Sequence, residues 1–158
     1  MKKYRLNAGI VLFRNDGKVL LCERMENYPK RWQFPQGGVD EGETPLEAAT
    51  RELKEETSVV SAQKVYALSE PLKYDFPPSV LAKNAKKKIF NVGQEQYWFL
   101  FYFDGDEKEI NLQTEEQEFR SYQWIELSKV VDMVVEFKQE VYKKIVAEFS
   151  GVINNYIE

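Results

Sequence analysis

The chain has 158 residues, 43% of them apolar, a length that suits one domain with a single sizeable core. Its net charge of −4 excludes a general nucleic-acid coating protein, which would be basic. It contains no histidine and one cysteine, Cys22, which excludes Ser-His-Asp and Cys-His nucleophilic sites and histidine- or cysteine-rich zinc centres. Any chemistry must therefore rest on carboxylates, cations and bound metal.

The sequence shows neither a secretory signal nor a membrane span. The start, MKKYRLNAG, has two lysines without an uninterrupted apolar stretch after them, and no run approaches the ~18 apolar residues that a bilayer requires. Cys22 cannot form an internal disulfide, and we interpret it as a small core residue. We expect a cytoplasmic protein with one domain, residues 1–158, and no membrane partner.

The predicted elements begin with a β-hairpin. Residues 6–14 and 18–24 are rich in strand formers, and the sequence Asn-Asp-Gly at 15–17 supplies turn chemistry between them. A loop then leads to a short aromatic segment, 32–34, which stops at a proline and a pair of glycines. We interpret its two aromatic side chains, Trp32 and Phe34, as core residues.

A helix is predicted next. Residues 44–47, Thr-Pro-Leu-Glu, combine a capping box with proline at the first helical position. Leu46, Ala49 and Leu53 recur at i, i+3 and i+7 and form its apolar stripe. β-branched residues weaken the helical pattern further on, so we expect the helix to end near Ser58.

The second half of the chain mixes strands and helices. Residues 63–69 are predicted as a strand, and 71–93, with three prolines and a lysine cluster, as a long surface loop. Residues 96–103 form a strongly apolar strand that we expect to be buried on both faces, and 119–127 form another strand. The last element is a helix near 135–149. This order predicts an α/β domain of two or three layers.

Three carboxylates share one face of the first predicted helix. At ~100° per residue, Glu52, Glu55 and Glu56 fall within an arc of roughly 100°, in the last turns of the helix. Like charges repel there, and the helix dipole adds to the cost, while Arg51 is expected to point roughly 100° away from their centre. A solvated helix face is the plain interpretation. A divalent cation is the alternative, because clustered hard oxygen ligands suit Mg²⁺ or Mn²⁺.

The spacing around this helix resembles the Nudix box. From Gly37 the chain reads GGVDEGETPLEAATRELKEETSV, with glycine, five residues, Glu43, seven residues, Arg-Glu-Leu at 51–53, one residue, and Glu-Glu at 55–56. So many fixed positions in about twenty residues make a strong signal. The family usually has glycine where this chain has Ser58, and serine at a left-handed helix end costs about 1 kcal/mol.

The resemblance implies a Nudix hydrolase, an α/β/α sandwich with a mixed sheet and a catalytic loop-helix-loop motif. Such enzymes cleave a phosphoanhydride in a nucleoside diphosphate linked to another group, using two or more divalent ions, Mg²⁺ or Mn²⁺. The implied metal ligands are Glu52, Glu55 and Glu56, with the carbonyl of Gly37 as an additional candidate. Glu43 and Arg51 would form an ion pair that fixes the loop against the helix. Bound metal would lower the pKa of water and neutralise phosphate charge.

Segments outside the box resemble the RNA pyrophosphohydrolases and the related dinucleoside polyphosphate hydrolases of this family. The likeness rests on WQFPQGG before the box, GQEQYWFL at 93–100 and VVEFKQEVYKKIVAEF at 134–149, and it runs from about 4 to 149. The first branch removes phosphates from the 5′ end of messenger RNA, and the second splits diadenosine polyphosphates. The leading expectation is an enzyme that acts on RNA 5′ ends, and a diadenosine polyphosphate hydrolase is the alternative. The sequence says little to separate the two and leaves any protein activator open.

The resemblance also implies substrate contacts. Arg5 and Arg24 would approach the phosphates and outer nucleotides, and Gln36 would contact phosphate. A wall for a base and a phosphate would consist of Val135, Phe137 and Lys138.

Glu118 would be a further carboxylate facing the helix, either as a metal ligand or as the base that takes the water proton. Plainer alternatives exist for these positions: strand-end cations for the arginines, core packing for Phe137, and an exposed acid for Glu118. Four lysines of the predicted loop are interpreted as part of a solvated loop, with an RNA track as the alternative; they are Lys83, Lys86, Lys87 and Lys88. A catalytically inactive binding module is disfavoured, because it would have no physical reason to keep three mutually repelling acids.

Overall fold

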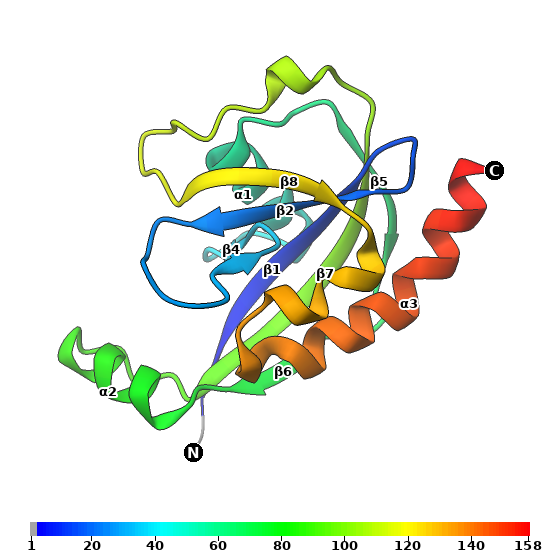
Figure 1. Cartoon of the computed structure of the whole chain (residues 1–158). Coiled ribbons are helices and arrows are strands. Elements are labelled where there is room, and N and C mark those ends of the chain that lie inside the picture. Colours follow the sequence, from blue (N-terminus) through cyan, green and yellow to red (C-terminus); the bar gives the residue numbers. More distant parts are fainter. Residues whose placement is uncertain (1–2) are drawn as a thin grey trace.

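The computed structural model describes residues 3–158, which form a mixed β-sheet with a helix on each face (Figure 1). The strands are β1 (Tyr4–Phe13), β2 (Val19–Arg24), β3 (Trp32–Gln33), β4 (Gln36–Gly38), β5 (Ala62–Ala67), β6 (Leu72–Asp75), β7 (Gly93–Phe103) and β8 (Phe119–Ile125). The helices are α1 (Pro45–Thr57), α2 (Pro78–Lys86) and α3 (Gln139–Ile157). Short 3₁₀ turns occupy Glu107–Glu109, Leu127–Lys129, Val131–Met133 and Glu136–Lys138.

The sheet is built around one parallel pair. β1 and β7 run side by side from Tyr4 opposite Gly93 to Phe13 opposite Tyr102. The other pairings are antiparallel: β2, β3 and β8 extend the sheet beyond β1, while β5 and β6 pair with β7. Because a parallel pair is covered on both faces, β7 is continuously apolar from Tyr97 to Phe103, close to the predicted apolar strand.

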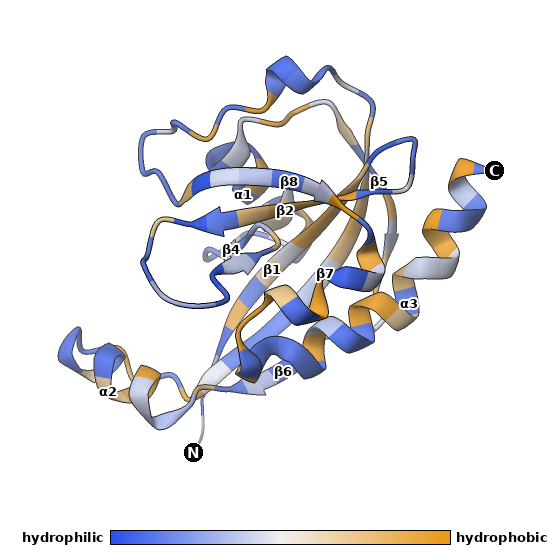
Figure 2. Ribbon diagram, in the orientation of Figure 1, coloured by the Kyte–Doolittle hydropathy of each residue, from blue (hydrophilic) through white to orange (hydrophobic). Residues whose placement is uncertain are grey.

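The two faces of the sheet have separate cores. On one face Ile10 and Leu12 pack with Leu53 of α1, and on the other Val11 packs with Ile145 of α3. This alternation along β1 follows from the two-residue period of a strand. Figure 2 shows the apolar strands lying between the two helices. The result is the predicted three-layer α/β/α sandwich, with Cys22 fully buried in the α1 core as expected.

The predicted turn and helix caps are present. Gly17 has φ +84° in the β1–β2 turn, and its N–H donates to the Arg14 carbonyl at 2.8 Å. The Thr44 hydroxyl accepts from the Glu47 N–H, and the Glu47 carboxylate accepts from the Thr44 N–H, which completes the capping box. α1 ends at Thr57, next to the predicted boundary.

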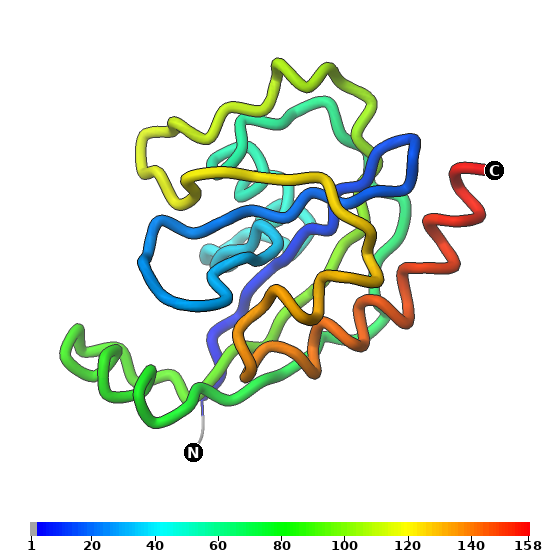
Figure 3. The backbone as a smooth tube through the Cα atoms, in the orientation of Figure 1, coloured from blue at the N-terminus to red at the C-terminus, as the bar shows by residue number. Residues whose placement is uncertain are grey.

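The prediction of a loop over 71–93 was wrong. β6 pairs with β7 along this stretch, and α2 follows with Pro77 at its N-cap and Pro78 inside its first turn. Proline starts a helix well, because its missing N–H needs no partner there. In Figure 3 the chain leaves β6, forms α2 near the N-terminal ends of β1 and β7, and returns into β7.

The last helix also differs from its prediction. Residues 136–138 form a 3₁₀ turn, and α3 starts at Gln139 and continues to Ile157, beyond the predicted end at 149. Its additional turns bury Ile153 and place the Tyr156 ring 5.3 Å from the Phe13 ring. No helix within residues 3–158 has the length and apolar character needed to cross a bilayer.

Candidate active site

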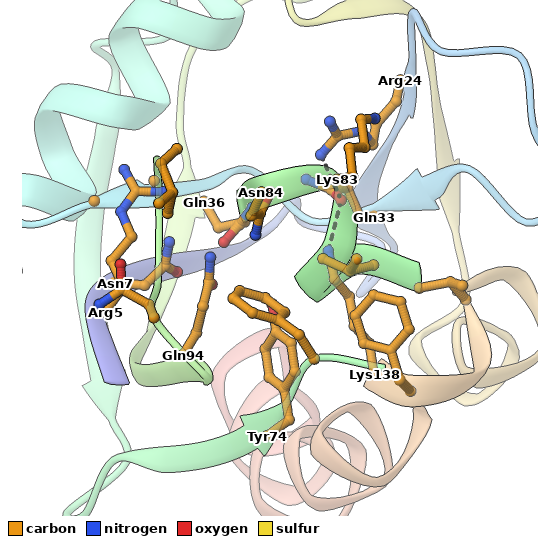
Figure 4. A pocket seen from close by; sticks show the side chains of 18 of the residues that line it. Arg5, Asn7, Arg24, Gln33, Gln36, Tyr74, Lys83, Asn84, Gln94 and Lys138 are labelled. Carbon is orange, nitrogen blue, oxygen red and sulfur yellow. Dashed lines mark hydrogen bonds between the residues drawn. The ribbon is translucent and has the colours of Figure 1, made fainter. Parts of the chain in front are cut away.

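A cleft of about 660 Å³ opens where β1, β4, α1, α2 and the segment before α3 meet (Figure 4). It brings together side chains from positions far apart in the sequence. Of the residues expected at the site, those that line the cleft are Arg5, Arg24, Gln36, Gly37, Glu52, Glu56, Glu118, Val135, Phe137 and Lys138. Three of these are acids, two from α1 and one just before β8, and three are cations from other elements.

Glu56 is the most buried acid of the cleft. It is 5% exposed, and its Oε1 has no hydrogen-bond partner within the described residues. Burial, and then the neighbouring Glu52 carboxylate, raise the pKa of Glu56 well above its ordinary value. Burial also raises the pKa of Glu52. A side chain at Gly37 would overlap the Glu52 carboxylate, so glycine lets β4 lie against this acid without displacing it.

Arg51 joins the loop before α1 to the helix. Its Nε and Nη2 donate to the Glu43 carboxylate at 2.7 and 2.9 Å, and Nη2 also donates to the Gly38 carbonyl at 2.9 Å. The hydrogen bond from Arg51 lowers the pKa of Glu43 to about 2. The expected ion pair between Glu43 and Arg51 is thus present in the structure, outside the cleft lining.

Arg51 also contacts the acidic face, contrary to the expectation that it would point away. Its Nη1 lies 2.8 Å from Glu52 Oε1 and 3.1 Å from Glu55 Oε2. The side chain is long enough for its guanidinium group to reach Glu52, Glu55 and the loop before the helix, so the direction of its Cα–Cβ bond did not determine where the charge lies. Glu55 does not line the cleft, and its side chain is 57% exposed.

Glu52 and Glu56 form one wall of the cleft, which we call the acidic wall. Its chemistry fits a divalent cation shared with a phosphate substrate. Within residues 3–158, no three acidic, histidine or cysteine side chains are arranged closely enough to enclose a metal ion by themselves. Mg²⁺ commonly keeps several waters and binds through one or two carboxylates plus substrate phosphates. The unpaired buried Oε1 of Glu56 and the adjacent Glu52 carboxylate are the hard oxygen donors for such a site.

Arg24 and Lys138 form a second wall of the cleft, the cationic wall, and both contact Gln33. Lys138 Nζ donates to Gln33 Oε1 at 3.1 Å, and Arg24 Nη1 donates to the same oxygen at 3.5 Å. Burial, and then the nearby charge of Arg24, lower the pKa of Lys138 to about 8. Arg24 also pairs with Glu26. Phe137 both lines the cleft and packs on Tyr74, with ring centroids 5.7 Å apart, so the alternatives of core and cleft apply together.

A buried amide network, not expected from the sequence, supports Gln36. Gln96 Nε2 donates to Asn7 Oδ1 at 3.0 Å and to Gln36 Oε1 at 3.2 Å. Asn7 is fully buried and Gln96 is 3% exposed. The oxygen of Gln36 is engaged in this network, and Gln36 itself lines the cleft. Polar residues inside otherwise apolar strands were the available signal.

One wall of the cleft comes from α2, which the sequence interpretation missed. Its cleft-lining residues recur on one helical face; they are Ser79, Val80, Lys83 and Asn84, followed by Lys87 just after the helix. Lys83 lies in α2 and Lys87 at its C-cap, and both line the cleft while they remain exposed to solvent, whereas Lys86 and Lys88 lie outside the lining. The available signal was a stretch, 76–94, with four lysines and no acid in an acidic chain.

The chain is similar to known proteins in its sequence and in its fold. The profile of the NUDIX domain family matches residues 3–149. An RNA pyrophosphohydrolase from Caulobacter vibrioides is 45% identical over 94% of this chain and 87% of its own length, and one from Pelagibacter ubique is 39% identical over 95% and 94%. The structure of a C. elegans Ap4A hydrolase binary complex has a TM-score of 0.62 at 21% identity, covering 92% of this chain and 98% of that one.

Proposed function

The chain belongs to the Nudix hydrolase family, and on that premise we propose that it hydrolyses a phosphoanhydride bond at the 5′ end of RNA, releasing pyrophosphate or phosphate. The relatives named RNA pyrophosphohydrolase, which match nearly the whole chain, support this choice of substrate. Removal of the 5′ phosphates would prepare messenger RNA for decay in the cytoplasm.

The observation that supports the proposal most strongly is the division of one cleft into two walls. Glu52 and Glu56 form an acidic wall with an unpaired buried oxygen, and Arg24 and Lys138 form a cationic wall. A polyphosphate alone would be repelled by the acids, and a metal alone would be repelled by the cations. A polyphosphate together with a divalent metal satisfies both walls.

The residues of this chain have distinct proposed roles. Glu52 and Glu56, with the Gly37 carbonyl and Glu118 as further donors, would hold Mg²⁺ or Mn²⁺, with two or more ions in the full site. When bound, such ions lower the pKa of water and neutralise phosphate charge. Glu55, which lies outside the cleft lining, would be a further metal ligand at the edge of the site.

Arg5, Gln36 and Lys138 would orient the phosphates, and Arg24, Val135 and Phe137 would hold the terminal nucleotides. Glu118 lies just before β8 and is exposed in the cleft, so it is also the candidate for accepting the proton of the attacking water.

A competition assay tests the proposed substrate. 5′-Triphosphorylated RNA and diadenosine tetraphosphate would be supplied together to the protein with Mg²⁺, and both hydrolysis rates measured. We expect the RNA to be used preferentially, with activity lost after chelation by EDTA, and reduced at least 100-fold in Glu56→Gln. Preferential use of diadenosine tetraphosphate would contradict RNA as the preferred substrate and support a dinucleoside polyphosphate hydrolase. Full activity after EDTA would refute the metal requirement.

A further inference from the structure

The helix α2 is basic, exposed and turned toward the cleft. It has no buried residue, so the helix is not part of either core. Lys83 and Asn84 project from it toward the cleft, as Figure 4 shows, and Lys87 follows on the same face. A nine-residue helix without core burial is marginal in isolation, and its place in the wall of the cleft calls for a functional explanation.

The charge of this segment is opposite to that of the whole chain. Residues 76–94 contain four lysines and no aspartate or glutamate, whereas the chain carries 26 acids against 22 lysines and arginines. The basic face is therefore a local feature that attracts an anion to this side of the cleft. Lys83 and Lys87 are separated by about 6 Å along the helix direction, a distance that neighbouring phosphates of one strand can bridge.

The Glu26 carboxylate already links α2 to Arg24 of the cationic wall. Glu26 pairs with Arg24, and its Oε2 lies 3.7 Å from Lys83 Nζ. An acidic oxygen thus lies between two cations from different walls of the cleft. A phosphodiester has the same charge and could take this position if the exposed Glu26 side chain swung into solvent.

We propose that Lys83, Asn84 and Lys87 bind the phosphodiester backbone of RNA downstream of its 5′-terminal nucleotide, and so make α2 the element that selects RNA over dinucleoside polyphosphates. This rests on the proposed function. Dinucleoside polyphosphates have no phosphodiester beyond their second nucleoside, so they cannot use these contacts. Lys83 and Lys87 neutralise the phosphates of the RNA only over a short stretch, which agrees with the acidic net charge of the chain.

The test compares two variants with the same change of charge. Lys83→Gln/Lys87→Gln alters the cleft-lining pair, and Lys86→Gln/Lys88→Gln alters the neighbouring pair outside it. The full chain with Mg²⁺ is assayed on 5′-triphosphorylated RNAs of one to five nucleotides and on diadenosine tetraphosphate, at several salt concentrations. Equal melting temperatures of both variants and the parent confirm that folding is unchanged.

We expect kcat/KM of the parent to rise with RNA length, and the cleft-lining variant to lose most of that rise. Its ratio of kcat/KM on the pentanucleotide to that on diadenosine tetraphosphate should fall about five- to tenfold, and its salt slope by about 0.7 per lost phosphate contact. The outer variant should match the parent.

Equal losses in the two variants, or no change in the substrate ratio, would overturn the role of α2 while leaving the proposed function intact. A parent that hydrolyses diadenosine tetraphosphate but no RNA would overturn both.

Discussion

At the scale of single residues, Ser58 shows how a departure from the family pattern is accommodated. It ends α1 in the left-handed region, with φ +69°, where the family usually has glycine. Its N–H donates to the Lys54 carbonyl and its Oγ to the Asn111 carbonyl, both at 2.8 Å. The hydroxyl bond therefore offsets part of the backbone strain.

Substitutions at Ser58 should separate these two effects. Ser58→Ala removes the hydrogen bond and keeps the strain, so it should lower the free energy of unfolding by about 0.5–1.5 kcal/mol. Ser58→Gly removes both, so it should stay within about 0.5 kcal/mol of the parent. Urea denaturation of the three proteins checks this order, and equal stability of the alanine and glycine variants would contradict it.

Lys138 should give the enzyme an alkaline limit. With a pKa of about 8, its ammonium group loses a proton as pH rises through that value, and an uncharged amine attracts phosphate less. We expect kcat/KM on 5′-triphosphorylated RNA to fall about three- to tenfold between pH 7 and pH 9.5. Lys138→Arg keeps its charge throughout and should show a flatter profile. Identical alkaline falls in both proteins would exclude Lys138 as the titrating group.

At the scale of elements, local signals identified α1 well and α2 not at all. The capping box and apolar stripe of α1 specify its start and its buried face from adjacent residues. α2 lacks a core-facing stripe, because its inward face contacts a polar cleft. Two prolines then looked like loop signals although they begin the helix. The local sequence of residues 71–93 therefore does not distinguish a helix from a loop unless the position of the neighbouring sheet is known.

The length of α3 gives a second test at this scale. The helix continues past its predicted end because Ile153 is buried against the sheet, at 3% exposure. Ile153→Ala should therefore lower the free energy of unfolding by about 2–5 kcal/mol. The neighbouring Asn154→Ala, on the exposed face, is the matched control and should change it by less than about 0.5 kcal/mol. Similar melting temperatures for the two variants would contradict the packing of the last turns.

At the scale of the whole molecule, the site depends on contacts that a sequence cannot specify alone. The motif spacing predicted the Glu43–Arg51 pair and pointed to Glu52 and Glu56 of the cleft, since these lie within one loop and helix, whereas the exposed Glu55 lies outside the lining. The amide network of Asn7, Gln36 and Gln96 joins three strands, and its contacts follow from the register of β1 with β4 and β7. Register is a property of the folded sheet, so the polar residues stand out in the sequence but their contacts with one another were not predictable.

The structure also changes the account of the acidic face. Arg51 partly offsets the charges of Glu52 and Glu55, so repulsion is concentrated on Glu56, which is buried with one oxygen unpaired. The central claim is that this oxygen serves a divalent cation and makes the metal-free fold less stable. Replacing Glu56 with glutamine keeps the shape of the side chain and removes its charge.

The most direct test is the melting temperature of the parent and Glu56→Gln, each measured without divalent cations and with saturating Mg²⁺. Relief of like-charge and helix-dipole repulsion should stabilise the metal-free variant by roughly 0.5–1.5 kcal/mol, or about 1–6 °C. Mg²⁺ should then raise the melting temperature of the parent more than that of the variant, because only the parent keeps the full ligand set. A metal-free variant that melts below the parent, or equal Mg²⁺ shifts in both proteins, would contradict the account.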